Sequence, residues 1–207
     1  MEKSISSQPA VEIRQLRKTY DKGTVVAIKG LDLSVGRGEL LALIGPDGAG
    51  KTSLFRILAT LILPDAGQVE VLGYDVVKDF QSLRLITGYM PGRFALYQDL
   101  TVLENLSFFA TVFNTTIEAN YDLIKDIYVQ LEPFKHRRAS QLSGGMKQKL
   151  ALCCTLVHKP SILLLDEPTT GVDPVSRQEF WDILSKLKDD GMTMIVSTPY
   201  MDEARRC

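Results

Sequence analysis

The eight residues from Gly45 to Thr52 are Gly-Pro-Asp-Gly-Ala-Gly-Lys-Thr. They match Gly-x-x-x-x-Gly-Lys-Thr, the pattern of a phosphate-binding loop (P-loop). An apolar run of buried-strand type, Glu39 to Ile44, precedes them, and Lys51 to Leu61 follows with helical periodicity. A strand, a glycine-rich turn and a helix in this order point the first N–H groups of the helix at an anion. A glycine-rich turn that matches by chance is the alternative, and the flanking strand and helix argue against it.

The residue types in this loop suit a phosphate ligand. Gly48 and Gly50 allow a positive φ and a close approach of the backbone. Lys51 can reach the β- and γ-phosphates of a nucleotide, and the Thr52 hydroxyl can ligate Mg²⁺. We therefore predict a site for a nucleoside triphosphate with its magnesium ion.

The overall composition narrows the class of protein. Lys and Arg total 24 against 25 Asp and Glu, so the net charge is −1, which argues against a nucleic-acid interface. The sequence contains no run of 18 apolar residues, so it predicts no membrane span. The polar start MEKSISSQPA is not a signal peptide. Cys153 and Cys154 are adjacent on one predicted helix, so we expect reduced core residues of a cytosolic protein.

An antiparallel layer of strands is predicted beside the P-loop unit. Its expected strands are Val11 to Leu16, Val25 to Ile28, Leu31 to Val35 and Gln68 to Leu72. Residues 1–10 are expected to form a loose arm. Later elements are a helix over 79–86, a strand over 86–90, helices within 101–159, a strand over 161–165, a helix over 174–190 and a strand over 192–197. Thr101 and Glu104 predict a capping box at the start of a helix over 102–113.

A second glycine pair precedes another predicted helix, Met146 to His158. Residues 141–148 are Gln-Leu-Ser-Gly-Gly-Met-Lys-Gln. Ser143, Gly144 and Gly145 therefore stand at a helix N-terminus, where an anion is stabilised. A plain N-cap and turn would have the same sequence, so the pattern by itself is weak.

Two acids follow the apolar strand Ser161 to Leu165. Asp166 and Glu167 at the end of a buried strand are costly unless a cation or hydrogen-bond donors reach them. Asp166 has the position and chemistry of a second Mg²⁺ anchor, as in a Walker B strand. Glu167 is placed to orient or deprotonate a water molecule that attacks the γ-phosphate. We predict Lys51 and Glu167 as catalytic residues and Thr52 and Asp166 as the Mg²⁺ ligands.

These pieces together resemble the nucleotide-binding domain of ATP-binding cassette (ABC) proteins over about residues 11–207. The order is diagnostic: Tyr20, the P-loop, Leu-Ser-Gly-Gly at 142–145, then Leu-Leu-Leu-Asp-Glu-Pro at 163–168. The stretches 72–76 and 99–106 resemble bacterial export or drug-efflux cassettes in particular. The resemblance implies an α/β P-loop NTPase fold of ABC ATPase type, with a RecA-like core, an antiparallel β subdomain and a helical signature subdomain at about 93–158.

The resemblance also implies how the site works. Tyr20 would stack on adenine, and Asp166 and Glu167 would serve the chain's own ATP together with Gly45, Pro46, Asp47, Gly48, Ala49, Gly50, Lys51, Thr52 and Ser53. Ser143, Gly144 and Gly145 would contact ATP held by a second cassette, and Asp173 would belong to the D-loop that crosses a head-to-tail dimer. That dimer would be homomeric, heteromeric or tandem within one chain. The helices at 93–158 would receive a membrane transporter subunit, which places the domain on the cytoplasmic face of the membrane.

Two positions depart from the family pattern. Gly92 stands where Gln is usual, and Pro199 stands where His is usual. We expect Pro91-Gly92 to form a type II turn and Pro199 to lie in the first turn of a helix. Neither residue supplies a side-chain donor, and losing one such donor typically costs about 10²–10³ in rate. We therefore hypothesise that the chain binds ATP, hydrolyses it slowly and lends its signature to a competent partner.

Other classes of function stay open at this point. A soluble ABC protein that acts on ribosomes or DNA is one alternative, and a nucleotide-sensing module with little turnover is another. Because ABC cassettes continue beyond the helix that begins near Pro199, we expect the 207 residues to be a truncated part of a longer protein.

Overall fold

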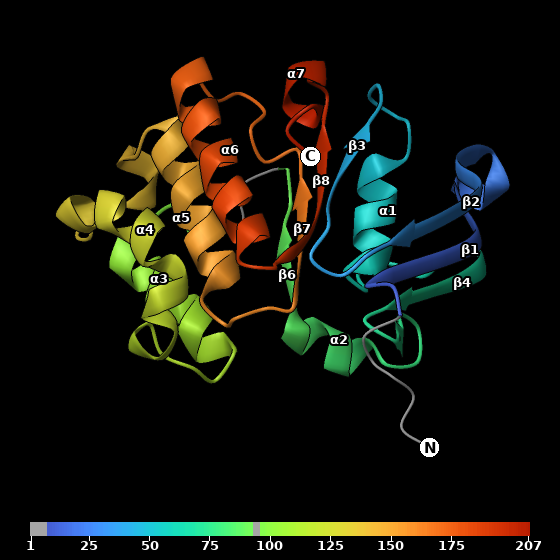
Figure 1. Ribbon diagram of the computed structural model, residues 1–207, viewed down its shortest axis with the longest axis horizontal. Coiled ribbons are helices and arrows are strands. Elements are labelled where there is room, and N and C mark those ends of the chain that lie inside the picture. Colours follow the sequence, from blue (N-terminus) through green and yellow to red (C-terminus); the bar gives the residue numbers. More distant parts are fainter. Residues whose placement is uncertain (1–7, 93–95) are drawn as a thin grey trace.

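Two four-stranded sheets meet around helix α1 (Lys51–Leu58) in the computed structural model, which describes residues 8–92 and 96–207 (Figure 1). The antiparallel sheet has the order β2-β1-β4-β5, with β1 Val11–Tyr20, β2 Val25–Val35, β4 Ala66–Val71 and β5 Tyr74–Asp75. The parallel sheet has the order β3-β8-β7-β6, with β3 Leu40–Ile44, β6 Thr87–Met90, β7 Ile162–Asp166 and β8 Thr193–Thr198. The predicted antiparallel layer beside an α/β P-loop unit is confirmed.

Four helices cover the face of the parallel sheet that is turned away from α1 (Figure 1). They are α3 (Val102–Val112), α4 (Tyr121–Leu131), α5 (Gly144–Leu156) and α6 (Pro174–Asp189). Helix α5 packs against α3, α4, α6 and β6. Helix α2 (Phe80–Ile86) precedes β6, and α7 (Met201–Ala204) follows β8. Single 3₁₀ turns lie at Asp21–Gly23, Glu118–Asn120, Glu132–Phe134 and Ala139–Gln141.

The alternation of side chains along β7 separates two hydrophobic cores. Leu163 and Leu165 belong to the core under the helices α3 to α6, whereas Ile162 and Leu164 belong to the core around α1. Successive side chains of a strand point to opposite faces. Asp166 therefore points to the same face as Ile162 and Leu164, toward α1 and the P-loop.

Strand β2 is continuous, although two strands separated by Lys29-Gly30 were expected. Its pairing with β1 shifts at this point, since Leu16 pairs with Leu31 and Arg17 pairs with Lys29. Gly30 is the extra residue, and its φ of 127° is accessible to glycine at little cost. The glycine therefore forms a bulge and lets the strand continue.

Strand β1 is also longer than expected and reaches Tyr20. Of the expected arm over 1–10, residues 1–7 lie outside the described residues. Ala10 joins the antiparallel sheet: its N–H donates to Val35 O, and its carbonyl accepts from Leu72 N–H, both at 2.7 Å. Cys153 and Cys154 are buried free thiols on α5, as predicted. Within residues 8–92 and 96–207, no helix has the length and apolar character to cross a membrane.

Asn105 fixes the loop that leads into α3. The predicted capping box of Thr101 and Glu104 is present at the start of this helix. Asn105 is fully buried, and its Nδ2 donates to the carbonyls of Tyr97, Leu100 and Thr101 while its Oδ1 accepts from Tyr97 N–H. One side chain thus supplies the hydrogen bonds that hold residues 97–101 in place.

We expect Asn105→Ala to lower the free energy of unfolding by about 1–3 kcal/mol, because it removes the hydrogen bonds of a buried side chain and takes away the acceptor of the Tyr97 N–H. Urea denaturation of the variant beside the wild type measures this. Ser107→Ala, at an exposed position of the same helix, is the control and should be within about 0.5 kcal/mol of the wild type. Equal stability of Asn105→Ala and Ser107→Ala would contradict the anchoring role.

Candidate functional site

The P-loop, Asp166 and Glu167 meet where the parallel strands end. Strand β3 pairs with β8 and β8 pairs with β7, so that Ile44 lies opposite Thr198 and Asp166 opposite Ser197. Loops that follow parallel strands emerge at the same edge of the sheet, where α/β proteins bind ligands. The P-loop follows β3 at this edge, and Glu167 follows β7.

Close contact with β2 fixes the P-loop at Gly50. This residue is the N-cap of α1 and has a φ of 87°. A Cβ atom built there would lie 2.3 Å from the carbonyl oxygen of Ala27. Gly48 also has a positive φ, of 80°, but a Cβ there would meet no atom within 4 Å. Gly50 is therefore required by both conformation and space, and Gly48 by conformation only.

The ammonium group of Lys51 has three oxygen partners at the sheet edge. Its Nζ donates to Gly45 O at 2.7 Å and to Pro46 O at 3.1 Å, and it lies 3.3 Å from Glu167 Oε1. The Lys51 side chain is 9% exposed and that of Glu167 is 22% exposed. The two residues predicted to be catalytic thus form an ion pair across the end of the sheet.

Ser197 makes hydrogen bonds to Asp166 at the end of β7 and to the next residue, Glu167. Its Oγ donates to Asp166 Oδ1 at 2.7 Å and accepts from the N–H of Glu167 at 2.9 Å. Glu167 has a φ of 51°, an unfavourable conformation for a residue other than glycine that persists where the surroundings impose it. The sequence analysis missed Ser197, although a serine at the end of the apolar stretch 192–196 is a usable signal.

Tyr20 lies at the mouth of a cavity of about 410 Å³ that the P-loop and Glu167 also line. Its Oη is 3.0 Å from Ser53 Oγ. Tyr20, Val25 and Val26 are large side chains that stay 36%, 50% and 48% exposed. They form an apolar platform that suits a flat aromatic ring. The cavity brings together Tyr20, Asp47, Gly48, Ala49, Gly50, Lys51, Thr52, Ser53 and Glu167.

The glycine pair lies at the exposed start of α5. Ser143 is the N-cap and accepts a hydrogen bond from Met146 N–H, while Gly144 is exposed and Gly145 is buried. A Cβ at Gly145 would lie 2.3 Å from Ser176 Oγ, so α5 packs tightly on the first turn of α6. The helix therefore begins two residues earlier than expected, directly after Ser143.

Asp173 caps helix α6 beside this glycine pair. Its Oδ1 accepts from Ser176 N–H at 2.9 Å, and the hydrogen bonds from Ser176 lower the pKa of Asp173. Ser143, Gly144, Gly145 and Asp173 do not line the cavity that holds Tyr20 and Lys51. Their predicted role toward a second cassette stays a prediction.

The two departures from the family pattern have local structures that differ from the expected ones. Gly92 lacks the positive φ that a type II turn needs at this position, so that prediction is wrong. A Cβ on Gly92 would lie 2.9 Å from Asp166 O, so Gly92 packs against the end of β7. Helix α7 begins at Met201 with Tyr200 as its N-cap, so Pro199 precedes the helix and does not lie in its first turn.

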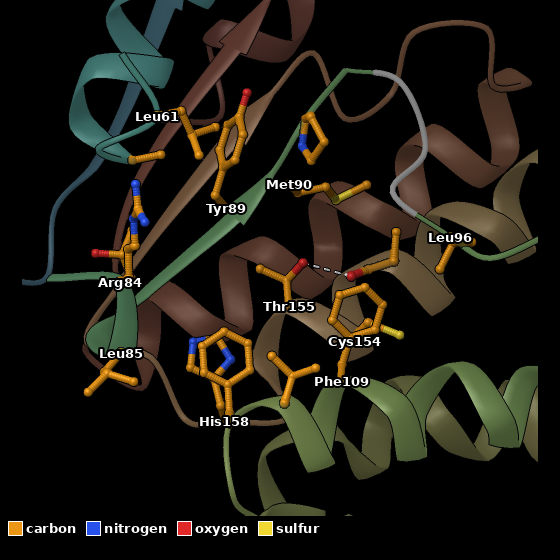
Figure 2. Close-up of a pocket in the computed structure, with 16 residues that line it drawn as sticks. Leu61, Arg84, Leu85, Tyr89, Met90, Leu96, Phe109, Cys154, Thr155 and His158 are labelled. Atoms are coloured by element: carbon orange, nitrogen blue, oxygen red, sulfur yellow. Dashed lines mark hydrogen bonds between the residues drawn. The ribbon is translucent and has the colours of Figure 1, made fainter. Parts of the chain in front are cut away.

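An apolar groove of about 510 Å³ is lined by residues of α3 and α5 and by residues of α2, β6 and the segment after α1. Figure 2 shows Phe109, Cys154 and His158 on one side of it and Leu61, Arg84 and Tyr89 on the other. Burial and, to a lesser extent, the charge of Asp166 raise the pKa of Tyr89. Tyr89 thus lines the groove from β6, the strand that pairs with β7.

Comparison with known proteins gives a consistent result. The family model "ABC transporter" matches residues 28–170. "Probable multidrug ABC transporter ATP-binding protein YbhF" of Escherichia coli (strain K12) is 45% identical over 199 residues, which cover 95% of this chain and 34% of that protein. "Doxorubicin resistance ATP-binding protein DrrA" of Mycobacterium tuberculosis (strain CDC 1551 / Oshkosh) is 38% identical over 200 residues, which cover 94% of this chain and 60% of that protein. The chain thus spans between one third and two thirds of the length of these relatives.

A solved structure with the same fold is the dimeric ATP-binding cassette MJ0796 in a post-hydrolysis state, bound to ADP and Pi. It superimposes with a TM-score of 0.83 at 27% sequence identity, covering 95% of this chain and 90% of that one.

We expect Gly50→Ala to weaken nucleotide binding about tenfold or more, because strained backbone costs about 1–3 kcal/mol and the new Cβ also displaces the loop from β2. Gly48→Ala carries the same conformational cost, but its Cβ would contact no neighbouring atom. It should therefore weaken binding less than Gly50→Ala. Fluorescent-nucleotide titration of both variants measures the difference. Equal affinities of the two variants would contradict the importance of the contact with Ala27.

Proposed function

Because this chain belongs to the ABC transporter family of ATP-binding domains, we propose that it binds and hydrolyses ATP to drive export across a membrane. The observation that carries this proposal is the convergence of Tyr20, the P-loop and Glu167 on one cavity, with Asp166 at the adjoining strand end. The relatives named above are a multidrug transporter protein and a doxorubicin resistance protein, which favours export over a ribosome- or DNA-directed role.

The residues of the cavity divide into three roles toward ATP. The Tyr20 platform takes the adenine, and the N–H groups at the start of α1 together with Lys51 take the phosphates. Glu167 orients the attacking water and accepts its proton. The water oxygen bonds to the γ-phosphorus while the bond from that phosphorus to the bridging oxygen breaks, so that ADP and phosphate leave. Lys51 pairs with Glu167 at 3.3 Å, so the same ammonium links the phosphate site to the base.

The donor set at the sheet edge fits a magnesium ion. Thr52 and Asp166 offer a hydroxyl and a carboxylate, the hard oxygen ligands that Mg²⁺ prefers. Asp166 is 3% exposed, and a carboxylate at this depth calls for a cation or further donors besides Ser197. When bound, Mg²⁺ supplies charge neutralisation at the phosphate oxygens.

A second cassette completes the active assembly in this proposal. Ser143 and Gly144 are exposed, and Asp173 lies beside them at the start of α6. These groups do not line the chain's own cavity, which suits contact with the nucleotide of a partner. The dimeric state of the MJ0796 cassette supports this arrangement. The dimer would be homomeric, heteromeric or formed by two cassettes of one chain.

The apolar groove is the proposed site of the membrane partner. Leu61, Leu85 and Val112 line it and are 54%, 64% and 59% exposed, an apolar surface of the kind that marks interaction sites. The occupant would be a short apolar helix of an integral membrane subunit. This contact would hold the domain at the cytoplasmic face of the membrane.

Turnover in the chain's own site would be slow. Gly92 and Pro199 supply no side-chain donor to a phosphate or a water, while Lys51, Thr52 and Asp166 remain in place. Binding should therefore survive better than hydrolysis, and the signature at Ser143 would serve a competent partner site.

The test is ATP binding beside ATP turnover on the purified chain, with Lys51→Ala as the control. We expect micromolar binding that Lys51→Ala weakens strongly, and turnover below about 1 s⁻¹, the lower end of common enzyme rates. Binding that does not depend on Lys51 would contradict the proposed site. Brisk, concentration-dependent turnover would show that Gly92 and Pro199 are tolerated in a homodimer.

We expect Leu85→Glu to weaken association with the membrane subunit about 10- to 100-fold, because it places a charge in an apolar contact. Leu63→Glu is the matched control, since Leu63 is 63% exposed but does not line the groove. Co-purification from detergent and ATP binding are measured for both. Equal loss for both variants, or none for either, would contradict the proposed docking site.

A further inference from the structure

Glu203 is a buried carboxylate that the roles above leave unexplained. It lies on α7 and is 3% exposed. Burial of a carboxylate is costly unless it is paired and hydrogen-bonded, and an apolar side chain of similar volume is often equally stable or more so. The contacts of this side chain therefore call for a reason other than stability.

Three segments converge on this carboxylate. The Thr169 hydroxyl donates to its two oxygens at 2.9 and 3.0 Å, and the Thr198 hydroxyl donates to Oε2. Arg177 Nη1 lies 3.7 Å from Oε1. Thr169 comes two residues after Glu167, Thr198 ends β8, and Arg177 lies in the first turns of α6.

The ion pair between Arg177 and Glu203 is long, at 3.7 Å. The guanidinium of Arg177 lies 4.3 Å from the ring centroid of Tyr200, and its buried Nε has no hydrogen-bond partner among the described residues. The two threonine hydroxyls, both of them buried, therefore make the directed contacts to Glu203. Those two contacts join the segment after Glu167 to the end of β8.

This junction bears on the strained backbone of Glu167. A residue other than glycine at a φ of 51° stays there only where its surroundings over-determine it. On one side, Ser197 holds the N–H of Glu167. On the other side, Thr170 N–H donates to Glu167 O at 3.2 Å, and Thr169 is tied to Glu203. The Glu203 carboxylate thus fixes Thr169 in the turn over residues 167–170, and this turn orients Glu167.

We propose that Glu203 is a positioning residue: its carboxylate holds Thr169 and Thr198 together and thereby keeps Glu167 aimed at the attacking water. The inference rests on the proposed ATP hydrolysis for its kinetic consequence only. Its structural consequence, the rigidity of residues 167–170, is independent of that function.

The kinetic test uses the full chain and compares Glu203→Gln with Asp202→Asn, the exposed acid next to it on the same helix. We expect Glu203→Gln to lower kcat about 10- to 100-fold, the range associated with a small misplacement of a reacting group. Its affinity for ATP should stay within about twofold, because the hydrogen bonds of Glu203 are made to Thr169 and Thr198 and not to the P-loop. Asp202→Asn should match the wild type. An unchanged kcat per ATP-binding molecule in Glu203→Gln would overturn the proposal.

Thr169 provides a second pair of variants if Glu203→Gln fails to fold. Thr169→Ser keeps the hydroxyl, so its kcat should equal that of the wild type. Thr169→Val removes the hydroxyl and should lower kcat by the same factor as Glu203→Gln. Equal effects of the two Thr169 substitutions would overturn the proposal.

Hydrogen exchange separates failure of this inference from failure of the proposed function. Should the wild type bind ATP without turnover, or not bind it, the backbone amides of Glu167, Thr169 and Thr170 give the answer. Faster exchange there in Glu203→Gln than in Asp202→Asn supports the positioning role. Equal exchange in the two variants overturns it.

Discussion

Asp166 ends a strand whose five residues are all buried, and a carboxylate at that depth is stable only where donors or cations reach it. Ser197 reaches it from β8, and the parallel register sets these two residues side by side. The same register places the end of β3 next to β8, so that the P-loop begins at the same edge. Lys51 then approaches Glu167, the neighbour of Asp166 in sequence. The positions of the charged groups thus follow from parallel pairing around one buried acid.

The alternation of side chains at this edge creates two separate chemical environments. Asp166 and Ser197 point to the face of the sheet that carries α1, where the P-loop lies. Thr198 is the next residue along β8, so it points to the opposite face, where Glu203 and α6 lie. The nucleotide side is rich in backbone N–H groups and open to a cavity, whereas the other side is a closed network of hydroxyl and carboxylate groups. Glu167 lies at the junction, because its backbone is held from both sides.

Local sequence was sufficient for the elements whose signals are local. The P-loop, the Walker B strand and the capping box at Thr101 each depend on residues within one strand, turn or helix, and the structure contains all three. The bulge at Gly30 and the backbone of Gly92 depend on neighbouring strands that are distant in sequence, so the local patterns gave the wrong conformation. Ser197 and Glu203 contact residues 31 and 34 positions away, a pairing that no periodicity in the chain encodes.

Gly92 stands where the family usually has glutamine, and this difference concerns the backbone as well as the absent amide side chain. In this structure a Cβ at position 92 would lie 2.9 Å from Asp166 O, closer than a side chain tolerates. Gly92 therefore lies against the end of β7, where a side chain would require the backbone to shift. A Gly92→Gln substitution would require the backbone at Gly92 to move away from Asp166 and Glu167, which are its immediate neighbours. The missing donor and the close packing on β7 thus occur at one position, which lies beside the residues proposed to act in hydrolysis and not beside the proposed phosphate site at α1.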